Sequence, residues 1–239
     1  MRRNVDGTAK DGSPVGLYAL LPETGEATLV HGAIPAGATV LELGAGAGRV
    51  TQPLAALGHP VLAVDNSSEM LAHVLTAETI RADIESLRLD RRFDAVLLAS
   101  QLVNTADAEL RRGLLATAAH HVRDGGTVLI QWHPPTWFDR VDSVARELGP
   151  VTIAVKDIVL DGDLLAATVH YDGAGQHWEH PFTARRMSTS DMTAELDAVG
   201  LRFGNWLTDD QTWFTATPNQ RSSAPESPSV SGDSDAQAT

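Results

Sequence analysis

The sequence predicts an α/β fold in which a doubly wound, mostly parallel sheet carries an antiparallel β insertion after its fifth strand. Three observations lead to this prediction. Between residues 39 and 132, short apolar runs alternate with segments of helical spacing, a pattern that implies crossovers between parallel strands. A glycine-rich stretch separates the first apolar run from the first helical segment. Beyond residue 150, longer strand patterns are separated by short turns, as in an antiparallel meander.

The first half of the chain is predicted to contain five parallel strands, each a short apolar run. They lie at 39–43, 60–64, 79–82, 93–99 and 127–132. Segments of helical spacing separate them at 49–57, 67–77 and 107–122. Ser67 or Ser68 is expected to cap the second helix, because a hydroxyl at that position accepts a hydrogen bond from the first turn. This alternation predicts a Rossmann-like half.

The second half begins with the predicted meander, whose strands are separated by Asp- and Gly-containing turns. These strands lie at 151–160, 164–171 and 176–182, and a helix at 190–199 then precedes closing strands at 201–207 and 212–217. The end of the chain is rich in Ser, Pro and Asp and too poor in large apolar residues to fold. We therefore expect a flexible N-terminus at 1–15, one domain at 16–218 with the insertion at about 150–183, and a disordered tail at 219–239.

The composition narrows the classes of function. Of the 239 residues, 43% are apolar, enough to bury a sizeable core. Acidic residues number 31 against 18 basic ones, and the net charge of −13 argues against a nucleic-acid partner. No apolar run approaches the ~20 residues of a membrane span, so no membrane partner is expected. The lack of cysteine excludes disulfides and thiolate metal sites and favours a cytoplasmic location.

The most informative segment is 40–49, where a strand, three alternating glycines and a helix follow one another. In a doubly wound sheet this loop lies where ligands bind, and glycines let a ligand approach the backbone closely. The dinucleotide fingerprint has another spacing, because Arg49 stands where its third glycine would be. Glu42, at the end of the strand, would repel a pyrophosphate and favours a ligand that carries positive charge.

Acidic residues also follow the next two predicted strands. Asp65 ends the second strand, where an acidic residue commonly pairs with ribose hydroxyls. Asp83 follows the third strand and could accept a hydrogen bond from an adenine amine while Ile84 packs on the ring. A capping role for Asp65 and a solvated turn for Asp83 are the alternatives. With the glycine loop, these residues point to a ligand that contains a nucleoside.

With these residues in place, the chain resembles the class I S-adenosylmethionine-dependent methyltransferases, in their small-molecule branch. Four motifs follow in the order typical of that family, at 42–48, 64–71, 82–84 and 93–101. The glycine turn at 122–127 also resembles that of the family, although Asp124 stands where proline is usual. The resemblance covers roughly 39–217 and implies S-adenosylmethionine as the cofactor. The cofactor-binding residues that it implies are Glu42, Gly44, Ala45, Gly46, Gly48, Asp65, Asn66, Met70, Asp83, Ile84, Ser100 and Gln101.

The catalytic residues are expected at the carboxyl ends of the later strands. His133 follows the fifth strand, and a histidine has a pKa suited to a general base. Gln101, at the end of the fourth strand, is the second catalytic candidate. It is preferred to Asn104, which can instead cap the following helix together with Thr105.

The acceptor pocket is expected beneath the antiparallel insertion, which is similar to the one that roofs this pocket in small-molecule methyltransferases. The predicted acceptor contacts are Tyr18, Trp132, Trp137, His170 and Trp178. His177 and His180 could suggest a zinc site, but their spacing puts them on opposite faces of a strand. No metal site is therefore predicted.

The sequence thus predicts an enzyme that transfers a methyl group from S-adenosylmethionine to an oxygen or nitrogen of a small-molecule acceptor, such as a metabolite or natural product. One alternative is a non-catalytic protein that binds S-adenosylmethionine. The other is an NAD(P)-dependent oxidoreductase, which Glu42 and the glycine spacing disfavour. The oligomeric state is left open, with a homodimer as one candidate.

Overall fold

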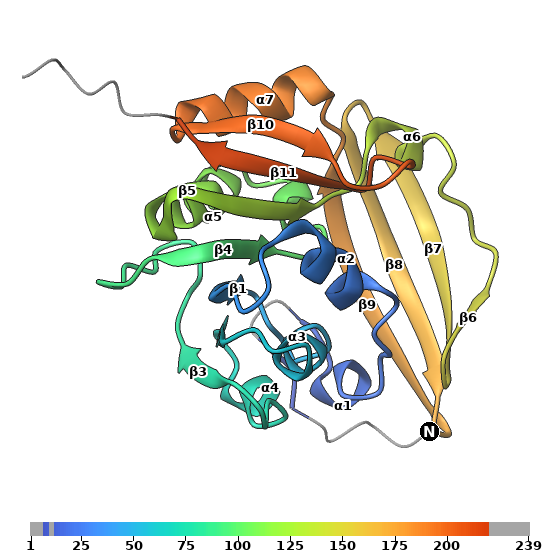
Figure 1. Ribbon diagram of the computed structural model, residues 1–239. Helices are drawn as coiled ribbons and strands as arrows, with labels where there is room; N and C mark the ends of the chain where they lie inside the picture. Colours follow the sequence, from blue (N-terminus) through green and yellow to red (C-terminus); the bar gives the residue numbers. More distant parts are fainter. Residues whose placement is uncertain (1–6, 10–11, 220–239) are drawn as a thin grey trace, which may run out of the picture.

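The computed structural model, which describes residues 7–9 and 12–219, is built on a central seven-stranded sheet (Figure 1). The strand order is β10-β11-β5-β4-β1-β2-β3. The pairs among β1 to β5 are parallel, and β11 runs antiparallel to both its neighbours. This arrangement confirms the predicted fold class. The strands are β1 (Val40–Leu43), β2 (Val61–Asp65), β3 (Glu78–Arg81), β4 (Phe93–Leu98), β5 (Val122–Gln131), β10 (Leu201–Trp206) and β11 (Trp213–Pro218).

Helices cover both faces of this sheet because successive strand residues point in opposite directions. Val40 packs in a cluster with side chains of α2 and α3, whereas Leu41 packs in another with side chains of α5 and α7. The helical elements are α1 (Val15–Tyr18), α2 (Glu26–Ala33), α3 (Thr51–Ala56), α4 (Ser68–Leu71), η1 (Leu102–Asn104), α5 (Ala108–His121), α6 (Pro135–Phe138) and α7 (Thr189–Ala198). None of the helices in the described part of the chain is long and apolar enough to cross a membrane.

Polar side chains cap the starts of α4, α5 and α7, with Ser188 in a capping box at α7. The Ser67 hydroxyl accepts a hydrogen bond from the Met70 N–H, which selects between the two predicted caps of α4. Asp107 caps α5, so Asn104 and Thr105 do not have the capping role suggested for them. The helix expected at 67–77 ends after one turn, and α2 is an element that the sequence pattern did not predict.

A second, antiparallel sheet is inserted between β5 and α7, as the sequence predicts. It has the order β6-β7-β8-β9 and stands at the right of the central sheet in Figure 1. Its inner face packs on α1, where Leu17 meets Val151, Tyr171 and Trp178. A β-bridge between Thr105 and Ala184 also joins it to the end of η1. Its strands are β6 (Arg146–Leu148), β7 (Val151–Asp161), β8 (Leu164–Gly173) and β9 (Gln176–Arg185).

The described part of the segment predicted to be flexible, 7–9 and 12–15, is held by backbone hydrogen bonds. The Val15 N–H donates to the Gly7 carbonyl over 3.1 Å, and Ala9 donates to Ser13 over 2.9 Å. Residues 1–6 and 10–11, and 220–239 of the predicted tail, lie outside the described residues.

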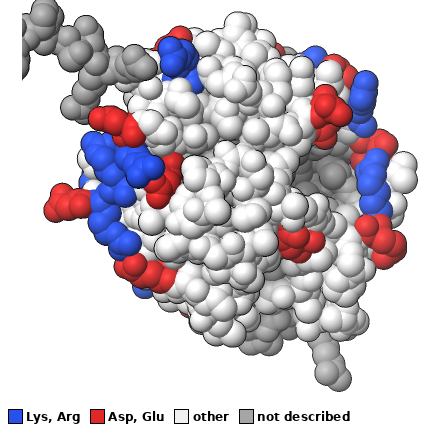
Figure 2. Space-filling view, viewed as in Figure 1, with Lys and Arg blue, Asp and Glu red and all other residues white. Residues whose placement is uncertain are grey.

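Charged side chains of both signs lie side by side around the rim of the face shown in Figure 2. Exposed ion pairs also occur, such as Arg91 with Glu78, whose charged atoms are 2.9 Å apart. Because both partners are open to solvent, pairs of this kind contribute little to stability.

Candidate functional site

A cavity of about 770 Å³ opens at the carboxyl ends of the parallel strands. It lies at the switch point between β1 and β4, whose connections run to opposite faces of the sheet. Its volume falls within the roughly 300–1,000 Å³ typical of small-molecule sites. Residues that follow β1, β2 and β4 form one side, and the inner face of the insertion forms the other. Its lining includes Gly44, Gly46, Asp65, Ile84, Ser100 and Gln101 on the first side and Val169, Tyr171, His180 and Phe182 on the second.

The glycine loop presents bare backbone to the cavity. Gly44 has φ +80°, a conformation that side chains rarely adopt, and a Cβ there would lie 2.8 Å from Leu102 Cδ1. The N–H groups of Gly44 and Ala45 donate to the Val64 carbonyl over 2.9 and 3.0 Å, which ties the loop to β2. The loop is therefore a fixed surface that a ligand can approach closely.

Asp65 holds the two loops that follow β1 and β2. One carboxylate oxygen, Oδ2, accepts from the Gly46 N–H, and the other, Oδ1, accepts from the Ser67 N–H, both over 2.9 Å. Both bonds come from backbone groups, so they fix the carboxylate at the cavity wall. Its remaining lone pairs can accept hydrogen bonds from a ligand's hydroxyls.

Glu42 does not reach the cavity, contrary to the prediction of a cofactor contact. Its side chain is buried, with the residue 2% exposed, and accepts a hydrogen bond from the Thr51 hydroxyl over 2.6 Å. Burial raises the pKa of this carboxyl to about 7, so it is only partly ionised at neutral pH. The prediction of a charged contact had treated it as fully ionised. The hydrogen bond with Thr51 joins the end of β1 to the first residue of α3, on either side of the glycine loop.

Ala45 and Gly48 also lie outside the cavity lining, although the resemblance implies cofactor contacts for them. Ala45 is buried among Ala63, Leu71 and Val74, because it points into the layer behind the loop. A Cβ on Gly48 would lie 2.9 Å from Val74, so this glycine allows close packing of the loop on its support.

The other residues implied for the cofactor lie close together. Asn66, Met70 and Ile84 line the main cavity. Asp83 lies instead in an adjoining hollow that Asn66 also lines, and the Asn66 amide donates to the Asp83 carboxylate over 3.4 Å. This hollow extends the site along the ends of β2 and β3.

Ser100 and Gln101 turn the chain sharply at the end of β4. Both are non-glycine residues with φ +55°, a left-handed conformation that costs of order 1–3 kcal/mol and is concentrated at functional sites. The Ser100 N–H donates to the Gln131 side chain over 2.7 Å, which holds the turn against β5. Both residues line the cavity.

His133 and Trp137 form a stacked pair in the cavity wall. Their ring centroids are 3.6 Å apart and their planes differ by 13°. Burial lowers the pKa of His133 to about 4, so the imidazole is neutral at neutral pH and one ring nitrogen can accept a proton.

Asn104, which the sequence ranked below Gln101, lines the cavity and holds His133, and Tyr171 and Phe182 are lining residues that the sequence did not single out. Asn104 is buried, and its side-chain oxygen accepts from the His133 N–H over 2.7 Å while its amide donates to the His133 carbonyl over 3.1 Å. The same amide donates to the Arg185 carbonyl over 3.1 Å, so Asn104 joins η1, the loop after β5 and the end of β9.

Tyr18 lies at the cavity, with Cδ1 of its ring 3.7 Å from a Cβ built on Gly46. Tyr171 lies there too, so both tyrosines of the chain line the same cavity. Burial, with a smaller contribution from Tyr18, raises the pKa of Tyr171 above its usual value and keeps its hydroxyl neutral.

Trp132, Trp178 and His170 lie outside the cavity, contrary to the prediction of acceptor contacts. Trp132 is 1% exposed and stacks on Trp206 in the core, because its neighbour His133 occupies the cavity side of the chain. Trp178 shares the inner face of β9 but is buried against Leu17 and Tyr171 and is not among the lining residues. His170 lies between Val169 and Tyr171 and therefore points to the outer face of β8.

The comparisons with known proteins agree with this geometry. Residues 40–126 match a family model described as a methyltransferase domain. A curated relative, the cypemycin N-terminal methyltransferase of a Streptomyces species, is 31% identical over 119 residues. That alignment covers 47% of this chain and 49% of the relative, so the chain spans about half the length of the curated relative that it matches.

Solved structures share the whole fold at low sequence identity. DesVI of Streptomyces venezuelae has a TM-score of 0.67 and 22% identity, covering 85% of this chain and 92% of its own. KedS8 of Streptoalloteichus, a sugar N-methyltransferase, has a TM-score of 0.66 and 20% identity, covering 92% of this chain and 98% of its own. At these identities the likeness shows the fold alone.

Proposed function

We propose that this chain, which carries a class I methyltransferase domain, transfers a methyl group from S-adenosylmethionine to a small-molecule acceptor. The observation that supports this most is that one cavity joins two kinds of wall. One wall has the motifs that resemble a cofactor site, and the other has the aromatic and histidine side chains of the insertion and the loop after β5. Methyl transfer requires donor and acceptor to meet in such an enclosed space, where alignment provides most of the catalysis.

The residues at the first wall fit the cofactor chemically. The exposed backbone of Gly44 and Gly46 suits close approach by the amino-acid part, and the fixed carboxylate of Asp65 suits ribose hydroxyls. Met70 and Ile84 provide apolar contacts for a base. When bound, S-adenosylmethionine supplies the electrophilic methyl group.

His133 is the proposed proton acceptor. Its ring is held by Trp137 and its backbone by Asn104, so its position is fixed before an acceptor binds. Because the imidazole is neutral, a ring nitrogen can accept a hydrogen bond from the N–H or O–H of the acceptor during transfer. A pKa of about 4 makes His133 a weak base, so it passes on to solvent any proton that it takes. Gln101, which lines the same cavity, is proposed to orient the acceptor.

A nitrogen of an amine-bearing small molecule is the favoured acceptor atom. KedS8 is a sugar N-methyltransferase, and the curated relative is an N-terminal methyltransferase. The rings of Trp137, Tyr171 and Phe182 give the wall flat faces, which suit a ring-shaped or cationic molecule. The proposal therefore favours a natural product or metabolite that carries a primary or secondary amine.

The test has two stages. Thermal unfolding is first measured with S-adenosylmethionine, S-adenosylhomocysteine and NAD(P), since ligand at 100 times its dissociation constant adds about 2.7 kcal/mol. Stabilisation by S-adenosylhomocysteine and none by NAD(P) is expected, and the reverse would overturn the proposal. Matched amine and hydroxyl acceptors are then assayed for methyl transfer. Cofactor binding with no transfer to any of them would support the alternative of a non-catalytic binding protein.

The cytoplasmic location and the homodimer stay predictions from the sequence. The first depends on the lack of cysteine. Sedimentation of the purified protein measures the second.

A further inference from the structure

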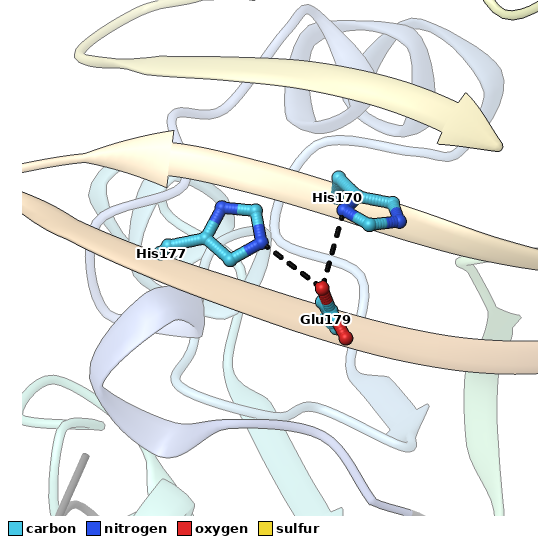
Figure 3. Close-up of side chains that lie close together, drawn as sticks. All are labelled: His170, His177 and Glu179. Carbon is cyan, nitrogen blue, oxygen red and sulfur yellow. Dashed lines mark hydrogen bonds and ion pairs between the residues drawn. The ribbon is translucent and has the colours of Figure 1, made fainter. Parts of the chain in front are cut away.

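Three side chains that could bind a metal lie together on the outer face of the inserted sheet, on β8 and β9 (Figure 3). One ligand atom from each of His170, His177 and Glu179 falls within 4.8 Å of the other two. His170 pairs with Glu179 across the strands, and Asp172 pairs with His177 in the next position on the same face. The antiparallel register therefore brings these side chains together, which their spacing in sequence does not reveal.

The distances from Glu179 to the two imidazoles are long for hydrogen bonds and match the spacing of metal ligands. The Glu179 oxygen Oε1 lies 3.5 Å from His170 Nδ1, as an ion pair, and 3.3 Å from His177 Nε2, as a hydrogen bond. A strong charge-assisted hydrogen bond is shorter, at about 2.7–2.9 Å. Ligands about 2.0–2.1 Å from a tetrahedral Zn²⁺ are separated from one another by about 3.3 Å, which is close to both distances.

The remaining nitrogen of His177 is held as it is in metal sites. His177 Nδ1 lies 2.8 Å from Asp172 Oδ1, a true hydrogen-bond distance. With an ion bound in place of the Nε2 proton, this bond would fix the tautomer so that Nε2 carries the lone pair toward the metal, in the carboxylate–histidine–metal arrangement. His170 Nε2 is buried and has no hydrogen-bond partner among the described residues, so the Nδ1 of that ring is the atom placed to bind the ion beside Glu179.

We infer that His170, His177 and Glu179 form a binding site for one Zn²⁺ or a similar divalent transition-metal ion. Two imidazole nitrogens and one carboxylate oxygen are a ligand set that zinc uses with a fourth, open position. That position is open to solvent here, because the side chains of His177 and Glu179 are 46% and 58% exposed. This site replaces the sequence expectation of no metal, which had considered only His177 with His180.

The proposed ion would act at a distance from methyl transfer. His170 points outward, whereas its neighbours Val169 and Tyr171 line the cavity from the inner face of the same strand. An ion that joins β8 to β9 would hold together the two strands that carry Tyr171 and His180. The site would therefore stiffen the cavity wall and would not contact the acceptor.

The experiment measures metal binding directly, so that its result does not depend on the proposed activity. Full-length protein without a histidine tag is treated with a chelator and titrated with Zn²⁺ by calorimetry. Co²⁺ is used as a second probe, because its visible spectrum reports tetrahedral nitrogen and oxygen ligands. We expect one ion per chain with micromolar affinity, and a rise in the unfolding temperature on saturation with Zn²⁺.

Variants locate the ion. H177A and E179Q are each expected to weaken binding at least tenfold, and D172A to weaken it roughly 10–100-fold through the orientation of His177. H73A is the matched control, because His73 is an exposed histidine on the segment after α4. The folding of each variant is checked by its unfolding transition without metal.

Two results would overturn the inference. One is the absence of stoichiometric binding by the wild-type protein. The other is equal affinity in E179Q, H177A and H73A, which would mean that Zn²⁺ binds only to scattered surface histidines. The variants keep their cofactor cavity, so S-adenosylhomocysteine should raise their unfolding temperature as much as it raises that of the wild type. If it does, failure of the metal site would leave the proposed function standing.

Discussion

The carboxylate of Asp65 accepts a hydrogen bond from the backbone N–H of Gly46, with 2.9 Å between Oδ2 and the nitrogen. The bond joins the end of β2 to the loop that follows β1, so it closes the βαβ unit formed by β1, α3 and β2. The second carboxylate oxygen is bonded to the Ser67 N–H. Asp65 is therefore both a cavity residue and the support of the glycine loop, which links ligand binding to the folding of this edge.

Replacing Asp65 tests this double role. In D65A the N–H groups of Gly46 and Ser67 lose their acceptor, and a ligand loses its charged partner. Loss of a charged hydrogen-bond partner costs about 1.5–3 kcal/mol, so affinity for S-adenosylhomocysteine should fall roughly 10–100-fold. Calorimetric titration measures this loss. D65N keeps one oxygen acceptor and should lose less, while wild-type affinity in D65A would remove Asp65 from cofactor binding.

His133 is predicted to affect turnover and not cofactor affinity. H133A removes the proton acceptor and should lower kcat by roughly 10²–10⁴-fold, the usual contribution of general acid–base catalysis. The binding of S-adenosylhomocysteine should stay within twofold of wild type, because the cofactor wall lies on the other side of the cavity. Single-turnover rates and titrations on the same preparation measure the two effects. Equal rates in H133A and wild type would exclude the role.

Asn104 is predicted to act through His133. N104A leaves the His133 N–H and the carbonyls of His133 and Arg185 without their partner, and it should lower kcat while the ring of His133 remains present. H121A is the matched control, since His121 is also buried and bonded to Leu89 and Thr117 but lies away from the cavity. Both variants should lose stability by about 1–3 kcal/mol. Only N104A should lose turnover, and a similar loss in H121A would reduce Asn104 to a structural role.

The stability of the protein should depend on pH through two buried groups, Glu42 and His133, whose effects on stability have opposite signs. The pKa of Glu42 is about 7 in the folded chain against an ordinary 4.5, so the folded state binds more protons between these values and stability falls as pH rises. The pKa of His133 is about 4 against an ordinary 6.5, so here the unfolded state binds more protons and stability rises with pH. The two effects oppose each other in the wild type.

E42Q separates these effects. Glutamine keeps an acceptor for the Thr51 hydroxyl but has no proton to lose. The stability of E42Q relative to wild type should therefore increase between pH 4.5 and 7, by about 3 kcal/mol at most for a shift of this size. Denaturant unfolding of both proteins at intervals across this range measures the difference. A difference that does not change with pH would mean that Glu42 titrates normally in the folded state.

The parts of this molecule that the sequence predicted are those specified by local patterns. The glycine loop and Asp65 are marked by strand ends and spacing, so their place at the switch point could be predicted. The role of Asn104 in holding His133 could not be predicted in this way. It depends on the loop after β5 and on the end of β9, which only the folded chain brings together. Trp132 and His133 are adjacent, and the pattern did not reveal which of them faces the cavity.

The helix α2 was missed for a similar reason. It follows Gly25, which provides no side-chain cap, so the usual start signal is absent. It is held instead by an ion pair between Glu26 and Arg49 and by packing on α3. In the sequence, Arg49 only marks a departure from the dinucleotide fingerprint. In the folded chain, it joins α2 to the end of the glycine loop through Glu26.

Gly44 offers the sharpest test of the glycine loop. G44A should cost about 1–2 kcal/mol, since φ is +80° there and an L-residue is strained in that conformation. The new Cβ would lie 2.8 Å from the flexible end of Leu102 and at an ordinary contact distance of 3.5 Å from Ile84 Cδ1, so the fold should survive. G58A is the matched control, with φ +90° and no atom within 4 Å of the added Cβ. Both should lose similar stability in denaturant unfolding, but only G44A should lose affinity for S-adenosylhomocysteine. Retained affinity in G44A would mean that the ligand does not approach this backbone.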